Sequence, residues 1–390
     1  DKLERGAKRE GKTAREVADF FTAKYQGDCK LLNIKSPDIW CRATDHIKEQ
    51  IDMIIDLEKK GFTYSTSDGI YFDTSKSPNY GQLAKLNIEG LKEGARVEIN
   101  PEKKNITDFA LWKFSPKGEK RHMEWGSPWG IGFPGWHIEC SAMSIKYLGQ
   151  PFDIHAGAID LIPIHHTNEI AQNEAVYGHK TVNCWLHGGF LMVDGGKMGK
   201  SLGNAYRIEE IIARGFDPLV FRYLTYTAHY RQPLNFTWES LKQASNSYSK
   251  LIVTLYPHCK EAQKLYESGD INSGWNDKFT EAINDDLNMP RAIAIVWDML
   301  RVNRDPIKVL ATIFKFDEVL GLLLKERMED FAREMRDIPR TKELATLLNE
   351  RDEARKNKDW KRSDELRAQL EQLGYTVNDA SDGSTLIPKK

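Results

Sequence analysis

The chain has few cysteines, no long apolar run and almost no net charge, and each absence argues against a class of protein. No hydrophobic stretch approaches the roughly 20 residues that a helix needs to cross a bilayer. The first twenty residues are charged, so we expect no secretory signal peptide. With a formal net charge of −1, any contact with nucleic acid must come from local patches. We therefore expect a cytoplasmic protein without membrane contact.

The cysteines are too scattered to form a disulfide framework. They stand at positions 29, 41, 140, 184 and 259, and this odd, dispersed set is typical of a reducing compartment. Most of them are expected to be small buried hydrophobic residues. Cys140 is the exception, because other potential metal ligands follow it in the sequence.

The first third of the chain predicts helices followed by short strands, and 390 residues predict two to four domains. Thr13 to Glu16 has the pattern of a capping box before a helix that Gly27 can end. A second helix is expected at about 44–60, and a hairpin over 62–74 around Asp68-Gly69. Residues 76–134 are rich in Pro, Gly and Lys and predict loops and short strands.

The pattern changes at residue 135 to alternating strands and helices, and after residue 206 to helices. Strands are expected at 151–155 and 184–187, with helices at 138–148 and 165–177 between them. The later helices are expected at 208–214, 218–228, 238–268, 275–284, 290–304, 306–324, 341–356 and 359–373. A strand at 375–377 and a polar tail close the chain. The predicted fold class is α/β with a helical C-terminal part.

Three side chains form a candidate zinc-ligand set. Cys140 lies in an apolar helix start, and His165 and Glu169 are four residues apart, which places both on one helix face. A thiolate, an imidazole and a carboxylate suit zinc and leave a fourth position open. Alternatively, Cys140 packs in a core and the other two belong to a polar helix start. His166, three residues before Glu169, competes with His165 as the ligand.

Two further groups are candidates for substrate binding. Lys197 and Lys200-Ser201 follow the glycine pairs at 188–189 and 195–196, and such a loop can bring amide and ammonium groups to phosphate. The alternative is a solvated basic turn. Trp136, His137 and His155 are candidates for lining a small-molecule pocket, and Asp160 for holding an ammonium group. Taken one at a time, each of these residues is better explained by packing against the sheet.

The order of these motifs resembles the cysteinyl-tRNA synthetases, a family of class I aminoacyl-tRNA synthetases. The most specific match is Gly-Trp-His-Ile-Glu-Cys-Ser-Ala-Met at 135–143. Phe-Asp-Ile-His at 152–155 and His-His-Thr-Asn-Glu-Ile-Ala-Gln at 165–172 also match. Lys-Met-Gly-Lys-Ser-Leu-Gly-Asn at 197–204 is a variant of the loop usually written KMSKS, with Gly199 in place of serine. The resemblance covers essentially the whole chain.

The resemblance implies activation of L-cysteine by ATP to cysteinyl-adenylate, and its transfer to tRNA(Cys). Zinc would bind the substrate thiolate, with Cys140, His165 and Glu169 as ligands, and Mg²⁺ would accompany ATP. Trp136, His155 and Asp160 fall on substrate-pocket positions. Lys197, Met198, Gly199, Lys200 and Ser201 form the mobile loop, in which Lys197 and Lys200 are catalytic and Lys200 and Ser201 contact ATP. A monomer is expected.

The family's architecture implies a Rossmann-like parallel sheet, split by an insertion and followed by helical parts. The expected division is 1–43 for the rest of the first catalytic half, 44–132 for the connective insertion, 133–205 for the second catalytic half, 206–240 for the stem-contact region, 241–337 for the helical bundle and 338–390 for the anticodon-binding domain.

The family's HIGH motif and its first zinc-ligand cysteine have no counterpart in the sequence, which contains no His-x-Gly-His string. We therefore expect an N-terminally truncated synthetase that lacks the opening βα unit, activates cysteine poorly and holds zinc weakly. Two alternatives stay open: a cysteine ligase of the mycothiol pathway, and a non-catalytic paralogue that binds RNA or a protein partner. The helices at 341–373 favour the synthetase over the ligase.

Overall fold

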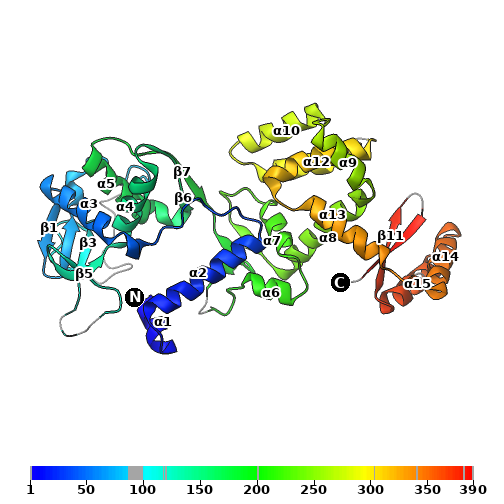
Figure 1. Ribbon diagram of the computed structural model, residues 1–390, viewed down its shortest axis with the longest axis horizontal. Helices are drawn as coiled ribbons and strands as arrows, with labels where there is room; N and C mark the ends of the chain where they lie inside the picture. Colours follow the sequence, from blue (N-terminus) through cyan, green and yellow to red (C-terminus); the bar gives the residue numbers. More distant parts are fainter. Residues whose placement is uncertain are drawn as a thin grey trace. The chain divides into compact units, whose positions relative to one another are not determined.

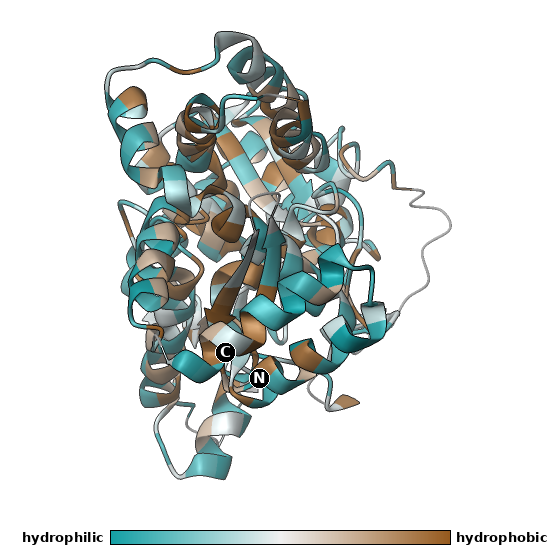
Figure 2. Cartoon of the chain, turned by 90° about the vertical axis from the view of Figure 1, so that its right-hand side faces the viewer, coloured by the Kyte–Doolittle hydropathy of each residue, from teal (hydrophilic) through white to brown (hydrophobic). Residues whose placement is uncertain are grey.

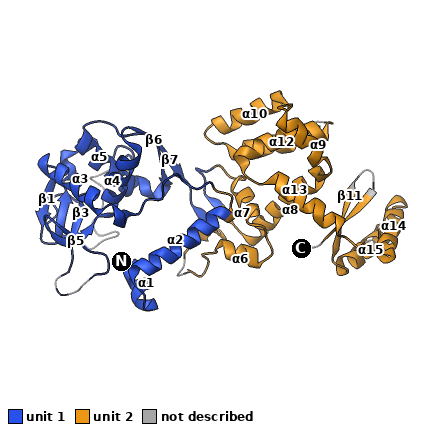
Figure 3. Ribbon diagram, in the orientation of Figure 1, with its two compact units in different colours: residues 1–30, 35–192, 230–234 blue, residues 31–34, 193–229, 235–390 orange. Residues whose placement is uncertain are grey.

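The chain folds into two units, each built around its own buried residues. The computed structural model describes residues 2–86, 100–116, 118, 121–199, 202–302, 304–339, 341–380 and 383–388. The first unit consists of residues 1–30, 35–192 and 230–234, and the second of residues 31–34, 193–229 and 235–390 (Figure 3). No helix in the described part is long and apolar enough to span a membrane. In Figure 2 most helices carry both hydrophilic and hydrophobic residues.

The chain begins with helices α1 (Lys2–Glu10) and α2 (Ala14–Leu31). The predicted capping box is confirmed: Glu16 N donates to Thr13 Oγ1 at 3.2 Å, and Thr13 N donates to the Glu16 carboxylate at 2.8 Å. The predicted helix end at Gly27 is wrong, because α2 continues to Leu31. A glycine ends a helix when it adopts the left-handed conformation, and Gly27 does not adopt it.

A five-stranded antiparallel sheet dominates the first unit, in the order β1-β2-β3-β5-β4 (Figure 1). Its strands are β1 (Thr63–Thr66), β2 (Gly69–Phe72), β3 (Phe109–Phe114), β4 (Trp125–Ser127) and β5 (Gly130–Pro134). The predicted hairpin is confirmed, with Thr66 opposite Gly69. The sequence predicted loops and short strands over residues 76–134, but not that β3, β4 and β5 complete this sheet. A local sequence pattern does not show which distant strands pair with one another.

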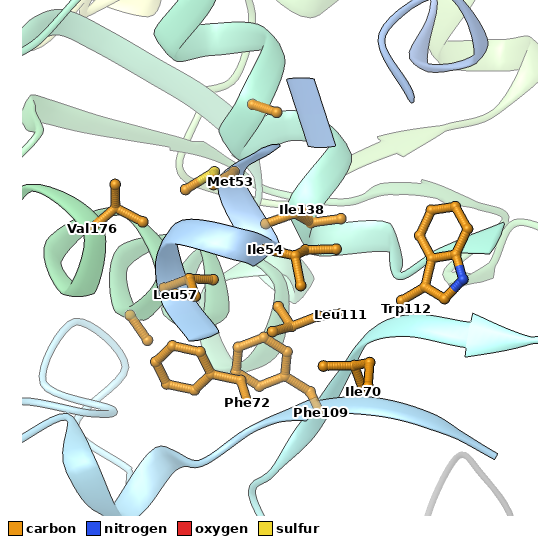
Figure 4. Packing of buried hydrophobic residues seen from close by; sticks show 12 residues of the cluster. Met53, Ile54, Leu57, Ile70, Phe72, Phe109, Leu111, Trp112, Ile138 and Val176 are labelled. Atoms are coloured by element: carbon orange, nitrogen blue, oxygen red, sulfur yellow. The ribbon is translucent and has the colours of Figure 1, made fainter. Parts of the chain in front are cut away.

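Helix α3 (Ile47–Lys59), which follows a 3₁₀ turn at Ala43–Asp45, covers this sheet together with α4 (Trp136–Leu148). Figure 4 shows the core between them. Its buried members are Met53, Ile54, Leu57, Ile70, Phe72, Phe109, Leu111, Trp112, Ile138, Ala142, Ala171 and Val176. Each large side chain among them contributes about 1.5–3 kcal/mol when fully buried. This core anchors α4, on which Cys140 lies.

A parallel strand pair follows, as the alternating pattern predicted. Strand β6 (Phe152–Ala158) pairs with β7 (Val182–Gly188) through the crossover helix α5 (Thr167–Tyr177). A 3₁₀ turn at Ile159–Leu161 and a π-helical turn at Ile162–His166 lead into α5. This parallel pair with its crossover helix confirms the α/β class, and the wider parallel sheet stays a prediction.

The chain then forms a small sheet of order β10-β8-β9 and becomes helical. The elements are β8 (Leu191–Val193), β9 (Gly196–Lys197), α6 (Ile208–Ala213), α7 (Pro218–Thr225), β10 (Leu234–Phe236), α8 (Trp238–Leu255), α9 (Cys259–Glu267), α10 (Ser273–Asn284), α11 (Met289–Val302), α12 (Pro306–Leu320) and α13 (Leu324–Arg336). The helix expected at 238–268 is divided by a 3₁₀ turn at Tyr256–His258, which contains Pro257. Helix α13 was not predicted.

The C-terminal part packs α14 (Lys342–Lys356) and α15 (Trp360–Gln372) against a hairpin of β11 (Tyr375–Ala380) and β12 (Gly383–Pro388). The predicted polar tail is wrong, since it forms β12 and buries Leu386 with Leu344 and Leu370. The expectation for the cysteines was also wrong. Cys259 is buried, whereas Cys41 and Cys184 are exposed.

Candidate metal centre

Helix α4, the π-helical turn at Ile162–His166 and helix α5 bring the three predicted ligands close together. The ligand atoms of Cys140, His165 and Glu169 all lie within 4.8 Å of one another. His165 stands in the π-helical turn and Glu169 in the first turn of α5, and His165 Nε2 lies 2.9 Å from Glu169 Oε1. The predicted i, i+4 relationship is therefore realised in space, and the thiol approaches it from another helix.

Glu169 is the most buried acid of this cluster, with 1% of its surface exposed. Neither carboxylate oxygen has an aligned hydrogen-bond donor in the described part of the chain. Burial alone would raise the pKa of Glu169, but the imidazoles of His155 and His165 outweigh it and lower the pKa to about 2. An ionised, buried carboxylate without aligned donors is costly unless a cation compensates it. This orphaned carboxylate fits a metal ion.

The thiol of Cys140 also fits a bound cation. Burial, with added repulsion from Glu169 and Glu139, raises the pKa of the Cys140 thiol to about 12. The group that binds metals is the thiolate, and a bound cation is what lowers a thiol pKa into the physiological range. The chemistry of the donor set therefore suits a divalent, thiophilic ion.

Histidines surround the three ligands and define a second overlapping set. The ligand atoms of His155, His166 and Glu169 also lie within 4.8 Å of one another. His166 Nδ1 lies 2.8 Å from His187 Nε2, and burial lowers the pKa of His166 to about 4. The sequence left open whether His165 or His166 joins Cys140. In the structure His165 belongs to the Cys140 set, and His166 faces His155 and His187.

His137 supports His165 from the first turn of α4. Its Nδ1 lies 2.9 Å from His165 Nδ1, so that the other nitrogen of His165 is left to face Glu169. Burial lowers the pKa of His137 to about 3, which keeps this ring neutral near pH 7. A hydrogen bond to the second ring nitrogen of a ligating histidine is the usual outer support of a metal site, and His137 is placed to provide it here.

The predicted substrate-pocket residues differ in how they meet this centre. Trp136 is 59% exposed, and its ring centroid lies 4.3 Å from that of His165. His155 Nε2 lies 3.4 Å from Glu169 Oε2. Asp160 is exposed in the 3₁₀ turn after β6, and among the described residues no hydrogen bond or ion pair joins it to the histidines. Trp136 and His155 thus contact the cluster, whereas no such contact is described for Asp160.

The sequence-based reasoning gave no role to Trp185 and His187 of β7. In the parallel register His155 stands opposite Trp185, and Gly157 opposite His187. The Trp185 ring lies 4.8 Å from both His155 and His166, centroid to centroid. The sequence could have indicated these two residues. Ligands bind beyond the carboxyl ends of parallel strands, and Trp-Leu-His at 185–187 follows the start of a predicted strand.

The lysine loop belongs to the second unit. Lys197 ends β9 and is exposed, whereas Lys200 and Ser201 lie outside the described residues. Asn204, the last residue of the matched motif, to which the sequence assigned no role of its own, closes the start of the loop. Its Nδ2 donates to Lys197 O at 3.0 Å, and its Oδ1 accepts from Gly199 N at 2.9 Å. One amide side chain thus spans the segment that contains Met198.

The fold resembles class I aminoacyl-tRNA synthetases. Methionyl-tRNA synthetase from Mycobacterium tuberculosis, solved with methionyl-adenylate, superposes with a TM-score of 0.57 at 16% identity, covering 84% of this chain and 81% of that one. Residues 1–246 match the family described as tRNA synthetases class I (C) catalytic domain. The fold and the family match together define a class I aminoacyl-tRNA synthetase.

Closer relatives specify the family. Residues 341–385 match the cysteinyl-tRNA ligase anticodon binding domain. Cysteine–tRNA ligase 1 of Burkholderia lata is 46% identical over 99% of this chain and 80% of its own length. The cysteine–tRNA ligase of Treponema denticola is 39% identical over 99% and 82%. The chain belongs to the cysteinyl-tRNA synthetase family, an enzyme family of cysteine–tRNA ligases.

Proposed function

We propose that the chain activates L-cysteine with ATP to cysteinyl-adenylate and pyrophosphate, and transfers the cysteinyl group to tRNA(Cys). Family membership supports this reaction. The single observation that supports the choice of amino acid is the convergence of Cys140, His165 and Glu169 within 4.8 Å. A site with that donor set suits a metal that binds sulfur, and sulfur is what distinguishes cysteine from serine.

We propose zinc as the ion, held by Cys140, His165 and Glu169. When bound, zinc supplies a soft acceptor that a substrate thiolate binds far better than a hydroxyl, so serine is rejected without an editing site. His137 orients the ring of His165. Glu169 contributes a buried negative charge that keeps the cation in place. Burial of these groups excludes the water that would compete for them.

The remaining pocket roles are proposals for Trp136, His155 and Asp160. The half-exposed Trp136 ring can cover the amino acid from the solvent side, since its centroid lies 4.3 Å from that of His165. His155, next to Glu169, can contact the substrate beside the ligand set. Asp160 can receive the substrate ammonium group, because its carboxylate is exposed in the 3₁₀ turn after β6.

We propose that Lys197 and the loop residues Lys200 and Ser201 bind the ATP phosphates, with Mg²⁺ accompanying ATP. Lysine ammonium groups at this loop would stabilise the charge that develops on the leaving pyrophosphate. The bracing by Asn204 supports such a role, because it holds the base of the loop while leaving the Lys197 side chain exposed. Binding of tRNA(Cys) is proposed for the C-terminal part, which matches an anticodon-binding family. The pair β6-β7 is proposed to belong to a Rossmann-like parallel sheet.

Cobalt substitution tests the proposal without relying on turnover. Co²⁺ added to metal-free protein should give a thiolate-to-metal absorption band that Cys140→Ser weakens. Addition of L-cysteine should strengthen this band, because a second thiolate binds, and L-serine should leave it unchanged. Cysteine-dependent charging of tRNA(Cys) then tests the complete reaction. Equal responses to L-cysteine and L-serine would contradict the proposed selection.

A further inference from the structure

Glu169 presents its two carboxylate oxygens to two different histidines. Oε1 lies 2.9 Å from His165 Nε2, in the ligand set that includes Cys140. Oε2 lies 3.4 Å from Nε2 of His155, which belongs to β6. The zinc site proposed above accounts for the oxygen beside His165. The oxygen beside His155 is equally buried and has no aligned donor in the described part of the chain, so a second cation would satisfy it.

The distance between Glu169 and His155 is that of two ligands on opposite edges of an ion. With metal–ligand bonds of about 2.0–2.1 Å and tetrahedral angles, two N or O donors stand about 3.3–3.4 Å apart. The 3.4 Å between Oε2 and His155 Nε2 matches this value, whereas a hydrogen bond from N to O is shorter, at about 2.7–3.2 Å. The ligand atom of His166 lies within 4.8 Å of the other two, so three donors surround one position.

His166 is held in the same way as the proposed zinc ligand His165. His187 Nε2 lies 2.8 Å from His166 Nδ1, just as His137 Nδ1 lies 2.9 Å from His165 Nδ1. In both cases a neighbouring imidazole contacts Nδ1 and leaves the other ring nitrogen for an ion. The outer support that is usual around metal-binding histidines therefore occurs twice in this cluster.

Burial and packing prepare these side chains for an ion. Glu169 and His166 are each 1% exposed, so little water competes for them. The His155 side chain is 16% exposed, so an ion can reach it from solvent. The Trp185 ring lies 4.8 Å from the rings of both histidines, centroid to centroid, and restricts their rotation. Side chains held in this way lose little further conformational entropy when they bind an ion.

We infer that His155, His166 and Glu169 form a second divalent-metal site, which shares the Glu169 carboxylate with the Cys140 site. Two imidazoles and a carboxylate suit first-row ions such as Zn²⁺, Co²⁺ and Ni²⁺. Paired metal ions in proteins stand about 3.5–4 Å apart, a separation that one carboxylate can bridge. Because a thiolate binds zinc strongly and the second set has none, the Cys140 site fills first and the second site fills when metal is in excess.

Metal titration of the full chain tests the second site. Metal-free protein is dialysed against increasing free Zn²⁺, and bound zinc is measured by mass spectrometry. The unsubstituted chain should take up a second equivalent after the first. His166→Asn should weaken that step by more than about 100-fold, and His187→Ala by about 10- to 100-fold, because loss of a ligand exceeds the loss of an outer support. His179→Asn changes an exposed histidine outside the cluster and should leave both steps unchanged.

Cobalt identifies the site that each equivalent fills. The first equivalent of Co²⁺ should give the thiolate-to-metal band, and the second should add visible absorption without strengthening that band. Cys140→Ser should lose the band and still take up Co²⁺ at the second site. Uptake of a single equivalent by the unsubstituted chain, or an unchanged second step in both His166→Asn and His187→Ala, overturns the inference.

A second ion should also weaken the binding of L-cysteine. This effect rests on the proposed function, in which His155 contacts the substrate, because an ion would occupy the His155 nitrogen and bring its own water ligands into the pocket. Calorimetry should show weaker binding of L-cysteine with two equivalents of zinc than with one, and no such difference in His166→Asn. Failure of L-cysteine to bind at one equivalent would refute the proposed function alone, since uptake of the second equivalent is measured without cysteine.

Discussion

Arg351 of α14 donates two hydrogen bonds to Asp379 of β11, from Nη1 at 2.7 Å and from Nη2 at 3.0 Å. The Arg351 side chain is only 1% exposed. Ser384 Oγ accepts a third bond from Arg351 Nη1 at 3.0 Å. A buried guanidinium therefore ties the last hairpin to α14, and this pair contributes to the stability of the C-terminal part.

Removal of the Asp379 charge should destabilise the C-terminal part strongly. Asp379→Asn leaves the Arg351 charge buried, and breaking a buried pair costs about 3–5 kcal/mol. We expect a loss of stability at the lower end of this range, because Asp379 is 26% exposed. Hydrogen exchange over residues 342–388 measures the loss of protection. Glu350→Gln is the control, since it breaks the exposed Arg362–Glu350 pair and should change stability by less than about 1 kcal/mol. Equal effects of both changes would contradict this prediction.

The same pair predicts how acid acts on this part. The hydrogen bond from Arg351, opposed by burial and assisted by Ser384, lowers the pKa of Asp379 to about 2. Because the folded pKa lies below the unfolded value of about 3.9, the stabilisation is present above pH ~4. It is lost as the pH falls from there through about 2. Hydrogen-exchange protection of β11 should fall in this window, and the pH dependence should be flatter in Asp379→Asn.

The contact between His137 and His165 should increase the affinity of the centre for zinc. His137→Ala removes the contact at 2.9 Å that orients the ligand ring, and such outer supports are worth about 10- to 100-fold. Zinc affinity, measured by competition with a chromophoric chelator, should fall by that factor. His179→Ala changes an exposed histidine whose ring contacts Lys180 O and should have no effect. An unchanged affinity in His137→Ala would show that His165 holds its orientation without this contact.

Gly157 on β6 should tolerate no side chain. A Cβ there would lie 2.6 Å from His166 Cε1 and 2.8 Å from Leu161 Cδ1, so that both neighbours must move. Gly157→Ala should cost about 1–3 kcal/mol, as overpacking does, and should displace His166 from His187. Chemical denaturation measures the first effect and histidine NMR the second. Gly126→Ala, with nothing within 4 Å of the added carbon, is the control.

The bracing of the lysine loop by Asn204 gives a local prediction. Asn204→Ala removes the bonds to Lys197 O and Gly199 N, and the loop base loses its closure. Amide exchange at Gly199 should accelerate, because its N–H loses its acceptor. Ser127→Ala, which removes a similar side-chain bond to Gly130 O in the first unit, should leave Gly199 exchange unchanged. Unaltered exchange at Gly199 in Asn204→Ala would exclude the bracing role.

Local features were the easiest to predict from the sequence. The capping box at Thr13, the hairpin at Asp68-Gly69 and the crossover helix of the β6-β7 pair depend on neighbouring residues, whose geometry follows from backbone periodicity. The helix end at Gly27 failed because glycine permits a left-handed turn without requiring one. Strands β3 and β12 were missed or misassigned because their pairing partners lie elsewhere in the chain.

The sequence by itself determined the helical spacing of His165 and Glu169, the order of the motifs and hence the family, because each is encoded within a short segment. Only the tertiary structure decided that Cys140 meets His165 rather than His166, and that His137, His155 and His187 surround them. The reason is physical. Spacing along a helix is set by its 3.6-residue turn, whereas contacts between α4, α5 and β7 are set by core packing and strand register.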